Sequence, residues 1–142
     1  MKLSVRLFGF LFFLMILYPM PSCNDLQESE VPDIPFSFLI NLILDNELTI
    51  PGNSKYYAYG GYGGVIIYCE TPESYYAYDA TCTYEISKNC RIVNNSIEGE
   101  CPCCKSKYIL LGGGYPAKGP AVAPLRQYQV TMVNSFTLRV YN

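Results

Sequence analysis

Two cysteine-bearing segments decide the fold of this chain: Tyr75–Tyr84, which reads YYAYDATCTY, and Cys101–Tyr108, which reads CPCCKSKY. The first segment opens with the closely spaced aromatic residues of a strand and ends in Cys-Thr-Tyr. The second, sixteen residues further on, places three cysteines in four positions. With Cys90, five cysteines fall within 23 residues. Loops so rich in thiols indicate disulfides, a metal site or both.

The sequence on either side predicts short strands joined by turns. Gly60–Gly64 (GGYGG) is typical of a hairpin loop, because glycine adopts positive φ without steric cost. No helical pattern follows it, so it does not indicate a phosphate-binding loop. No segment after Cys23 has a long 3.6-residue period, and the pattern favours an all-β sandwich or small barrel. Strands are predicted over residues 36–44, 55–59, 65–69, 75–79, 108–111, 126–133 and 137–141.

The composition excludes several classes of function. The chain has 142 residues and no histidine, so a Ser-His-Asp or Cys-His nucleophile and an imidazole-bound zinc are ruled out. The formal net charge is −2. Nucleic-acid-binding domains usually carry an excess of basic residues, so no nucleic-acid partner is expected. Paired carboxylates do not stand out either. The sequence predicts at most an electron-transfer component and does not favour an enzyme.

The N-terminus is typical of an export signal. Lys2 and Arg6 precede the apolar run Leu7–Tyr18, which is too short to span a bilayer. Met20–Cys23 (MPSC) then resembles a bacterial lipoprotein cleavage box, in which the thiol of Cys23 would carry the lipid. The alternative is ordinary cleavage just before this cysteine, which would leave its thiol free.

This signal divides the chain into three parts. We predict a lipoprotein signal peptide over 1–22, an acidic tether over 23–35 and a β domain over 36–142. Lipidation of Cys23 would also explain the odd number of seven cysteines, since six then remain for the domain. The expected location is the envelope of a Gram-negative bacterium, with the chain lipid-anchored at the periplasmic or outer-membrane face.

The two cysteine segments resemble the paired boxes of a Rieske iron–sulfur domain. Tyr75–Tyr84 resembles the first box, in which Cys-Thr-His follows an aromatic-rich strand, and Cys101–Tyr108 resembles the second, Cys-Pro-Cys-His-Gly-Ser. Gly112–Gly114 and Gly119–Ala121 resemble the third loop, and the similarity covers Val65–Tyr141. It implies a Rieske-like antiparallel sandwich or barrel with a cysteine-rich loop subdomain, a 2Fe–2S cluster and electron transfer.

The chain departs from the Rieske pattern at its ligands. A Rieske cluster takes two cysteines on one iron and two histidines on the other. Cys82 and Cys101 match the cysteines, whereas Tyr84 and Cys104 stand where the histidines would be. Lys105 also replaces the usual glycine. The redox chemistry that depends on imidazole ligands is therefore not carried over.

Three arrangements of the thiols stay open. Cys82, Cys101 and Cys104 could bind a 2Fe–2S cluster, a single iron or a zinc ion. The fourth ligand would then be one of three candidates: Cys90, Cys103 or Tyr84. Disulfides alone could instead staple the loops without any cofactor, and six cysteines allow 15 pairings. The third arrangement mixes both, and the resemblance permits it, because some Rieske proteins bridge their cluster loops near Cys90 and Cys103.

Two further residues have both a plain and a functional interpretation. The resemblance implies that the hydroxyls of Ser106 and Tyr108 bond cluster or ligand sulfur and tune its potential. Their plain interpretation is a turn residue and a strand residue. Cys69, at the end of an apolar strand, is interpreted as a small buried hydrophobic residue.

Two functions follow from these observations. The first is a membrane-anchored Rieske-like lipoprotein that binds a cluster or another metal and passes electrons to an unidentified redox or envelope protein. The alternative is a cluster-less, disulfide-stapled binding or structural module of the envelope. The retained thiols favour the first function, and the absence of histidine favours the second.

Overall fold

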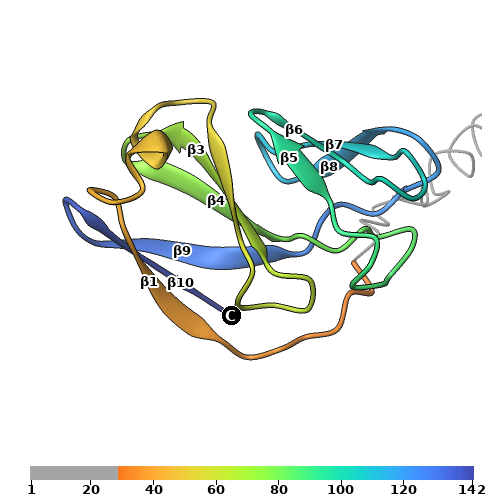
Figure 1. The fold of residues 1–142 in the computed structure, drawn as a ribbon, viewed down its shortest axis with the longest axis horizontal. Coiled ribbons are helices and arrows are strands. Elements are labelled where there is room, and N and C mark those ends of the chain that lie inside the picture. Colours follow the sequence, from red (N-terminus) through yellow and green to blue (C-terminus); the bar gives the residue numbers. More distant parts are fainter. Residues whose placement is uncertain (1–28) are drawn as a thin grey trace, which may run out of the picture.

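The computed structural model describes residues 29–142, which form ten strands and one short 3₁₀ helix in two antiparallel sheets (Figure 1). The predicted signal peptide over 1–22, Cys23 and residues 24–28 of the tether lie outside the described residues. The elements are β1 (Ser37–Asn41), η1 (Asn46–Thr49), β2 (Ser54–Tyr57), β3 (Val65–Thr71), β4 (Ser74–Asp79), β5 (Val93–Asn95), β6 (Glu98–Glu100), β7 (Lys107–Ile109), β8 (Tyr115–Lys118), β9 (Gln127–Asn134) and β10 (Thr137–Tyr141). Within 29–142, no helix is long and apolar enough to cross a bilayer.

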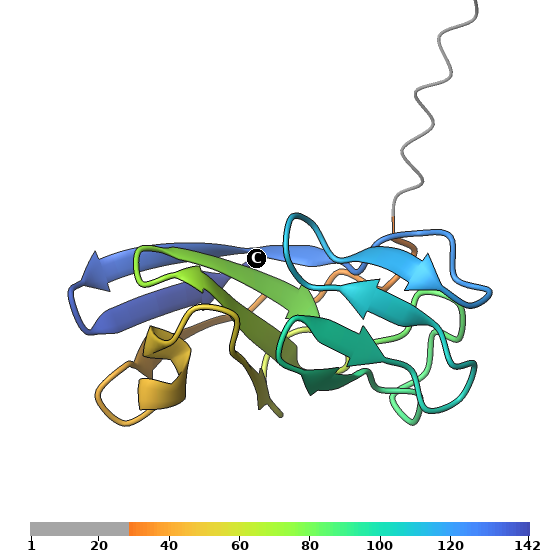
Figure 2. The ribbon, with the colours of Figure 1, turned by 90° about the horizontal axis from the view of Figure 1, so that it is seen from above.

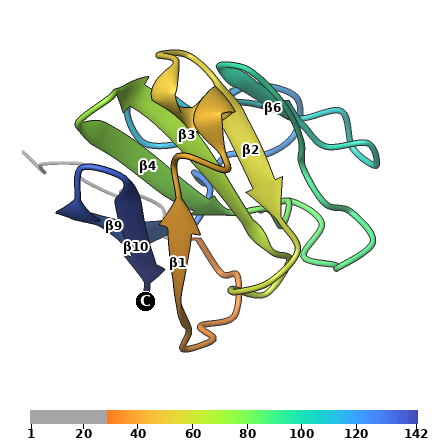
Figure 3. The same cartoon turned by 60° about the vertical axis from the view of Figure 1, so that its left-hand side comes forward.

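The larger sheet has the strand order β1-β10-β9-β4-β3-β2 and curls on itself. Figure 3 shows its edge strands β1 and β2 on the same side of the sheet. The ring of Phe38 on β1 lies 5.8 Å from that of Tyr57 on β2, so the two edges meet through aromatic contacts. Such curling gives the larger sheet the form of a small, incompletely closed barrel.

Strand β3 contributes to two separate cores. Side chains alternate between the faces of a strand, and here both faces are covered. Val65 and Ile67 join the core enclosed by the larger sheet, whereas Ile66 and Tyr68 join the core next to the smaller sheet. Full burial of each aliphatic side chain contributes about 1.5–3 kcal/mol. The continuous apolar run in this strand therefore reflects burial on both sides.

The smaller sheet, with strand order β5-β6-β7-β8, carries the cysteine-rich loops. Figures 1 and 2 show it at one end of the larger sheet, away from the β9–β10 turn. Its core contains Ile92, Tyr108 and Leu110, all of which are buried. This core also includes Cys82 and Cys101, so each cysteine loop is anchored to packed side chains through one buried cysteine.

Asp79, at the end of β4, fixes the glycine loop Gly60–Gly64 between β2 and β3. A Cβ at Gly61, where φ is +63°, would lie 2.5 Å from a carboxylate oxygen of Asp79, so this close approach requires glycine. The buried carboxylate accepts hydrogen bonds from three backbone N–H groups and one hydroxyl: Tyr62 (2.6 Å), Gly63 (3.1 Å), Thr81 (2.8 Å) and Tyr128 (2.7 Å).

The end of the predicted tether packs on the domain. Val31 is buried, with an exposed fraction of 2%. The Arg126 side chain donates to the carbonyl of Val31 at 3.1 Å and forms an ion pair with Asp33 at 3.0 Å. Residues 31–33 are thus held next to the start of β9.

The structure corrects several local expectations. The strand predicted over 36–44 ends at Asn41, and the chain turns into the 3₁₀ helix η1. The segment around Cys90 and Cys101, interpreted as loop, contains β5 and β6, and β8 follows the glycine turn. These strands have only three or four residues and little apolar alternation. Pairing with neighbouring strands, and not their own pattern, makes them strands: β6 and β8 pair with β7, and β5 pairs with β6.

Candidate metal centre

Cys82 lies on the loop that follows β4, and its side chain points into the protein. The loop is closed by backbone hydrogen bonds from Ile92 to Ala80 (2.7 Å) and from Cys82 to Cys90 (3.3 Å). Because these bonds tie the two ends of the loop together, the Cys82 side chain is fully buried between them.

The second cysteine segment forms a tight turn between β6 and β7. The backbone N–H of Cys101 donates to the Ser106 carbonyl at 2.8 Å, and the N–H of Lys105 donates to the Cys101 carbonyl at 3.0 Å. Lys105 adopts a φ of +63°, in the left-handed region that favours glycine. A lysine therefore occupies a backbone conformation that suits the glycine usual in the Rieske pattern.

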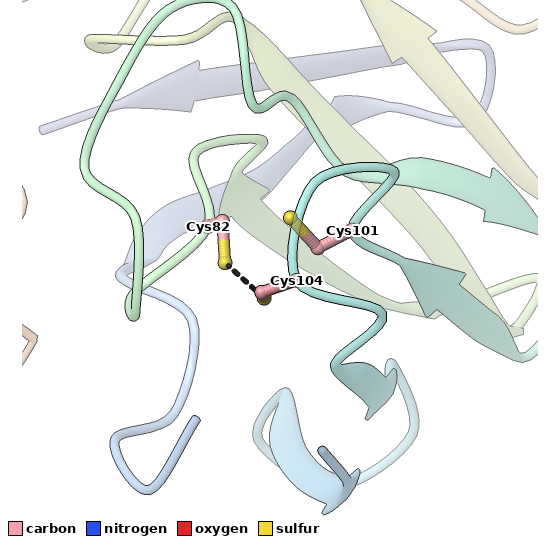
Figure 4. Close-up of side chains that lie close together, drawn as sticks. All are labelled: Cys82, Cys101 and Cys104. Carbon is pink, nitrogen blue, oxygen red and sulfur yellow. Dashed lines mark hydrogen bonds between the residues drawn. The ribbon is translucent and has the colours of Figure 1, made fainter. Parts of the chain in front are cut away.

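The two loops bring three free thiols together (Figure 4). The sulfurs of Cys82, Cys101 and Cys104 all lie within 4.8 Å of one another. The dashed line in Figure 4 marks the contact between Cys82 and Cys104, whose sulfurs lie 3.5 Å apart. Cys82 and Cys101 are fully buried, whereas Cys104 is partly accessible. The cluster is thus reachable from solvent on the Cys104 side.

A disulfide between Cys90 and Cys103 joins the same two loops, with a Cα–Cα distance of 5.6 Å. Their sulfurs are bonded to each other in this structure, so neither is a free thiolate. This pairing matches the mixed arrangement that the Rieske resemblance permits. Cys69 is a free, fully buried cysteine on β3, in agreement with its interpretation as a small hydrophobic residue.

Two buried hydroxyls contact the thiol cluster. The Tyr108 oxygen lies 3.5 Å from the sulfur of Cys82, and the Ser106 oxygen lies 3.2 Å from that of Cys104. Ser106 also accepts the backbone N–H of Ala121 at 3.0 Å, and Tyr108 lies 3.0 Å from the hydroxyl of Thr83. Each hydroxyl is therefore fixed by a second partner while it faces a sulfur.

Thr83 is a member of this network that the sequence did not single out. Its hydroxyl donates to the carbonyl of Ala123 at 2.8 Å, and its backbone N–H donates to the Tyr108 hydroxyl at 3.2 Å. It therefore ties the first cysteine loop both to Tyr108 and to the segment before β9. The only sequence signal was its position between Cys82 and Tyr84.

The surroundings shift the pKa values of the thiols in opposite directions. Burial raises the pKa of Cys101 to about 12. Burial also acts to raise the pKa of Cys104, but hydrogen bonds from Ser106, Cys82 and Cys101 outweigh it and place that pKa below the ordinary value of 9.0. Burial keeps the Tyr108 hydroxyl protonated by raising its pKa. Cys104 therefore loses its proton more readily than Cys101.

The residues present do not fit a Rieske cluster. That cluster needs two further ligands on a second iron, and Tyr84, at the position of the first histidine, has a side chain 58% exposed to solvent. The sequence-predicted residues that do meet are Cys82, Cys101 and Cys104, with Ser106 and Tyr108 beside them. In the described residues, this leaves one compact set of three sulfur donors.

Comparison with family models and with curated proteins finds no match. Among solved structures, the chain is similar to one described as the complex of reduced oxygenase and oxidised ferredoxin in carbazole 1,9a-dioxygenase, with a TM-score of 0.52 and 21% identity over 74% of this chain and 92% of that chain. The fold is Rieske-like. The Rieske-like domain thus combines the expected sheets and cysteine loops with a changed ligand set.

Two further solved structures are similar at lower scores. The ferredoxin of carbazole 1,9a-dioxygenase from Nocardioides aromaticivorans has a TM-score of 0.48 and 22% identity, covering 76% of this chain and 97% of that chain. A nitrite reductase small subunit from Mycobacterium tuberculosis, described by its title as NADH-dependent, has a TM-score of 0.48 and 15% identity, covering 78% and 97%.

Proposed function

We propose that this protein is a lipid-anchored electron-transfer component whose Rieske-like domain binds a metal through Cys82, Cys101 and Cys104. One observation carries the proposal: three free thiols from two loops lie within 4.8 Å of one another. The first and last of them, Cys82 and Cys104, are 22 residues apart in the sequence. Thiolates are the ligands that iron and zinc prefer in such sites.

The two loops that carry these thiols are held in position before a cation binds. The Cys90–Cys103 disulfide holds the two loops at a fixed separation, so little further ordering is needed when an ion binds. A buried thiolate is costly without a positive partner, and Cys82 and Cys101 are fully buried. A metal ion would supply that charge and allow all three thiols to lose their protons.

The spacing of the sulfurs favours one ion over a two-iron cluster. In a tetrahedral site with metal–sulfur bonds of about 2.3 Å, neighbouring sulfurs lie about 3.8 Å apart. Cys82 and Cys104 are close to this value at 3.5 Å, and all three sulfurs lie within 4.8 Å of one another, so they can surround one ion, whereas a two-iron cluster divides its ligands between two irons. A bound iron ion would supply one-electron chemistry, and the fourth position would remain open on the partly accessible Cys104 side.

Metal content and its dependence on individual thiols test the proposal. Protein purified without oxygen should contain one ion per chain and no acid-labile sulfide. Cys82→Ser, Cys101→Ser and Cys104→Ser should each weaken metal binding at least tenfold, whereas Cys69→Ser, which removes a free buried thiol outside the cluster, should leave it unchanged. A folded, reduced sample that binds neither iron nor zinc would contradict the proposal.

Cys23 supports the anchored part of the proposal, since Met20–Cys23 resembles a lipoprotein cleavage box. The expected partner is a redox or envelope protein at the membrane; one similar structure is a ferredoxin in complex with an oxygenase by its title. Cys23→Ser should move the protein from the membrane fraction to the soluble fraction and abolish labelling with a radioactive fatty acid. Unchanged membrane association would contradict lipid anchoring.

A second candidate function is the cluster-less envelope module. The observation that favours it is the 3.5 Å separation of the Cys82 and Cys104 sulfurs, because oxidation of this pair would leave only one thiol of the cluster. Mass mapping of the exported protein under non-reducing conditions separates the two candidates. A Cys82–Cys104 disulfide in freshly isolated protein would favour the module, and free or metal-protected thiols would favour the metal centre.

A further inference from the structure

A second polar site lies away from the thiol cluster, at the glycine loop Gly60–Gly64. The loop, together with Tyr56, Lys88 and Arg91, lines an open pocket of about 300 Å³. This volume lies at the lower end of the range found for small-molecule sites. The pocket thus joins the β2–β3 hairpin to the loop that carries Cys82 and Cys90.

Both cationic side chains of the pocket rest on tyrosine rings. The guanidinium carbon of Arg91 lies 4.2 Å from the ring centroid of Tyr56, and the ammonium of Lys88 lies 5.2 Å from that of Tyr62. A contact through the ring face attracts a cation without using its N–H groups. These groups therefore stay free to donate hydrogen bonds to something in the pocket.

Neither cation has a carboxylate partner in residues 29–142. Of the eight described Lys and Arg side chains, four form ion pairs with acidic groups: Lys55, Lys105, Lys107 and Arg126. Two of the remaining four, Lys88 and Arg91, face the same pocket. Asp79 lies beneath the same loop, but its carboxylate already accepts four hydrogen bonds from the protein, so the two cations without an ion pair are the charged groups open to a ligand.

The walls of this pocket are held in place by the core. Asp79 fixes the backbone N–H groups of Tyr62 and Gly63, and the Tyr56 hydroxyl donates to the carbonyl of Gly63 at 3.2 Å. Arg91 lies on the segment that bridges to Thr81. The glycine wall and Arg91 are therefore held in place before a ligand binds, which lowers the entropy cost of binding.

We propose that this pocket binds a small ligand carrying an oxyanion group, a phosphate or a carboxylate. Arginine matches the two oxygens of either group with paired N–H donors, and Lys88 adds a second, less directional positive charge. The ring of Tyr56 holds the guanidinium of Arg91 from one side, which orients it for such a pair. The site is independent of metal binding by the three thiols.

Calorimetric titration of the full-length protein tests this site. Inorganic phosphate and succinate represent the two sources of the oxyanion, and succinamide is the uncharged control. We expect one saturable site for at least one of the two anions, no binding of succinamide, and weaker binding at high salt. The anion that binds more tightly identifies whether the natural ligand is a phosphate or a carboxylate.

Variants assign the binding to the pocket. Arg91→Gln should weaken binding at least about tenfold, because it removes a charge-assisted hydrogen-bond pair, and Lys88→Gln should weaken it several-fold. Arg91→Lys should restore part of the loss. The matched control is Lys118→Gln, which removes an exposed lysine on β8 that has no ion pair in the described residues.

The results also separate this site from the metal centre. Cys104→Ser should leave anion binding unchanged even if metal binding is lost. Absence of binding by both anions at low salt would overturn the proposal. An equal loss of affinity in Lys118→Gln and Arg91→Gln, with both variants folded by circular dichroism, would also overturn it, because the attraction would then come from the overall charge.

Discussion

The sulfur of Cys82 lies 3.5 Å from the sulfur of Cys104, although the two residues belong to different loops 22 positions apart. One loop leaves the larger sheet after β4, and the other connects two strands of the smaller sheet. The contact therefore exists only because the two sheets pack against each other. This packing brings two separate cysteine motifs together as one set of three neighbouring thiols.

The first prediction concerns oxidation of this pair. In metal-free protein, oxidised glutathione should convert the Cys82 and Cys104 thiols into a disulfide, with two protons and two electrons passing to the glutathione, which is released as two thiols. Bound metal should slow the reaction, because it occupies both sulfurs. Non-reducing peptide mapping measures the product, and Cys69, which is free but buried elsewhere, should stay unmodified. Equal oxidation with and without metal would contradict the proposed ligands.

The Cys90–Cys103 disulfide is predicted to stabilise the domain. It closes a loop with a sequence separation of 13, and a loop of this size corresponds to about 3 kcal/mol in the chain-entropy model. Reduction of this disulfide should therefore lower the urea concentration at which half of the natural chain is unfolded. The double variant Cys90→Ala/Cys103→Ala should start at the lower midpoint and show no response to reductant. A response in the variant would indicate that a different disulfide carries the effect.

Substitution of Asp79 is predicted to lower the stability of the domain strongly. Its buried carboxylate accepts four hydrogen bonds that hold the glycine loop, Thr81 and Tyr128. Asp79→Asn should lower the free energy of unfolding by roughly 2–4 kcal/mol, since the amide nitrogen cannot accept the N–H groups it would face. Tyr128→Phe should cost about 1.5–3 kcal/mol. Urea denaturation measures both.

The control for Tyr128→Phe is Tyr115→Phe, at a tyrosine with an exposed fraction of 51%. Its free energy of unfolding should stay within about 0.5 kcal/mol of the natural chain. Equal effects at the two tyrosines would rule out the Asp79 hydrogen bond as the cause.

Lys105 is predicted to be a strained position. Its φ of +63° costs a residue with a side chain roughly 1–2 kcal/mol, part of which glycine would recover. Lys105→Gly should raise the free energy of unfolding by up to about 1 kcal/mol. Lys105→Ala, which removes the same charge but keeps a Cβ, should have almost no effect. If alanine and glycine behaved alike, the change would come from the lost charge and not from the backbone.

Asp45 is predicted to contribute to the acid dependence of stability. Burial acts to raise the pKa of Asp45, but hydrogen bonds from Lys55 (2.9 Å) and Tyr57 (2.8 Å) outweigh it, so that the pKa lies below the ordinary value of 3.8. The folded state therefore holds this proton less tightly than the unfolded state. The resulting stability is fully present above the unfolded pKa and is lost as the pH falls through the lower folded value.

Asp45→Asn tests this acid dependence. At about pH 7 it should lower the free energy of unfolding by about 0.5–1 kcal/mol, a value that allows for solvent screening of a partly exposed pair. The difference from the natural chain should shrink at about pH 3. Glu73→Gln, at an exposed acidic residue without an ion pair in the described residues, should show no such change. A constant difference at both pH values would exclude the proposed titration.

The sequence by itself determined the fold class and most of the larger sheet. The alternating aromatic residues before Asp79 and the apolar run from Val65 predicted β4 and β3, and Gly60–Gly64 predicted the hairpin between β2 and β3, because these patterns act over a few neighbouring residues. The Cys-Thr-Tyr and Cys-Pro-Cys-Cys segments likewise indicated a Rieske-like domain. The absence of histidine excluded the imidazole ligands.

The tertiary structure alone decided how these parts meet. Strands β5, β6 and β8 are too short to show a pattern, and they form because a neighbouring strand pairs with each: β7 with β6 and β8, and β6 with β5. The pairing of Cys90 with Cys103, the exposure of Tyr84 and the anchoring of the glycine loop by Asp79 depend on contacts between segments far apart in the chain. Such contacts are fixed by packing in three dimensions. A sequence can therefore name the candidate residues of a site, but packing selects which of them lie together.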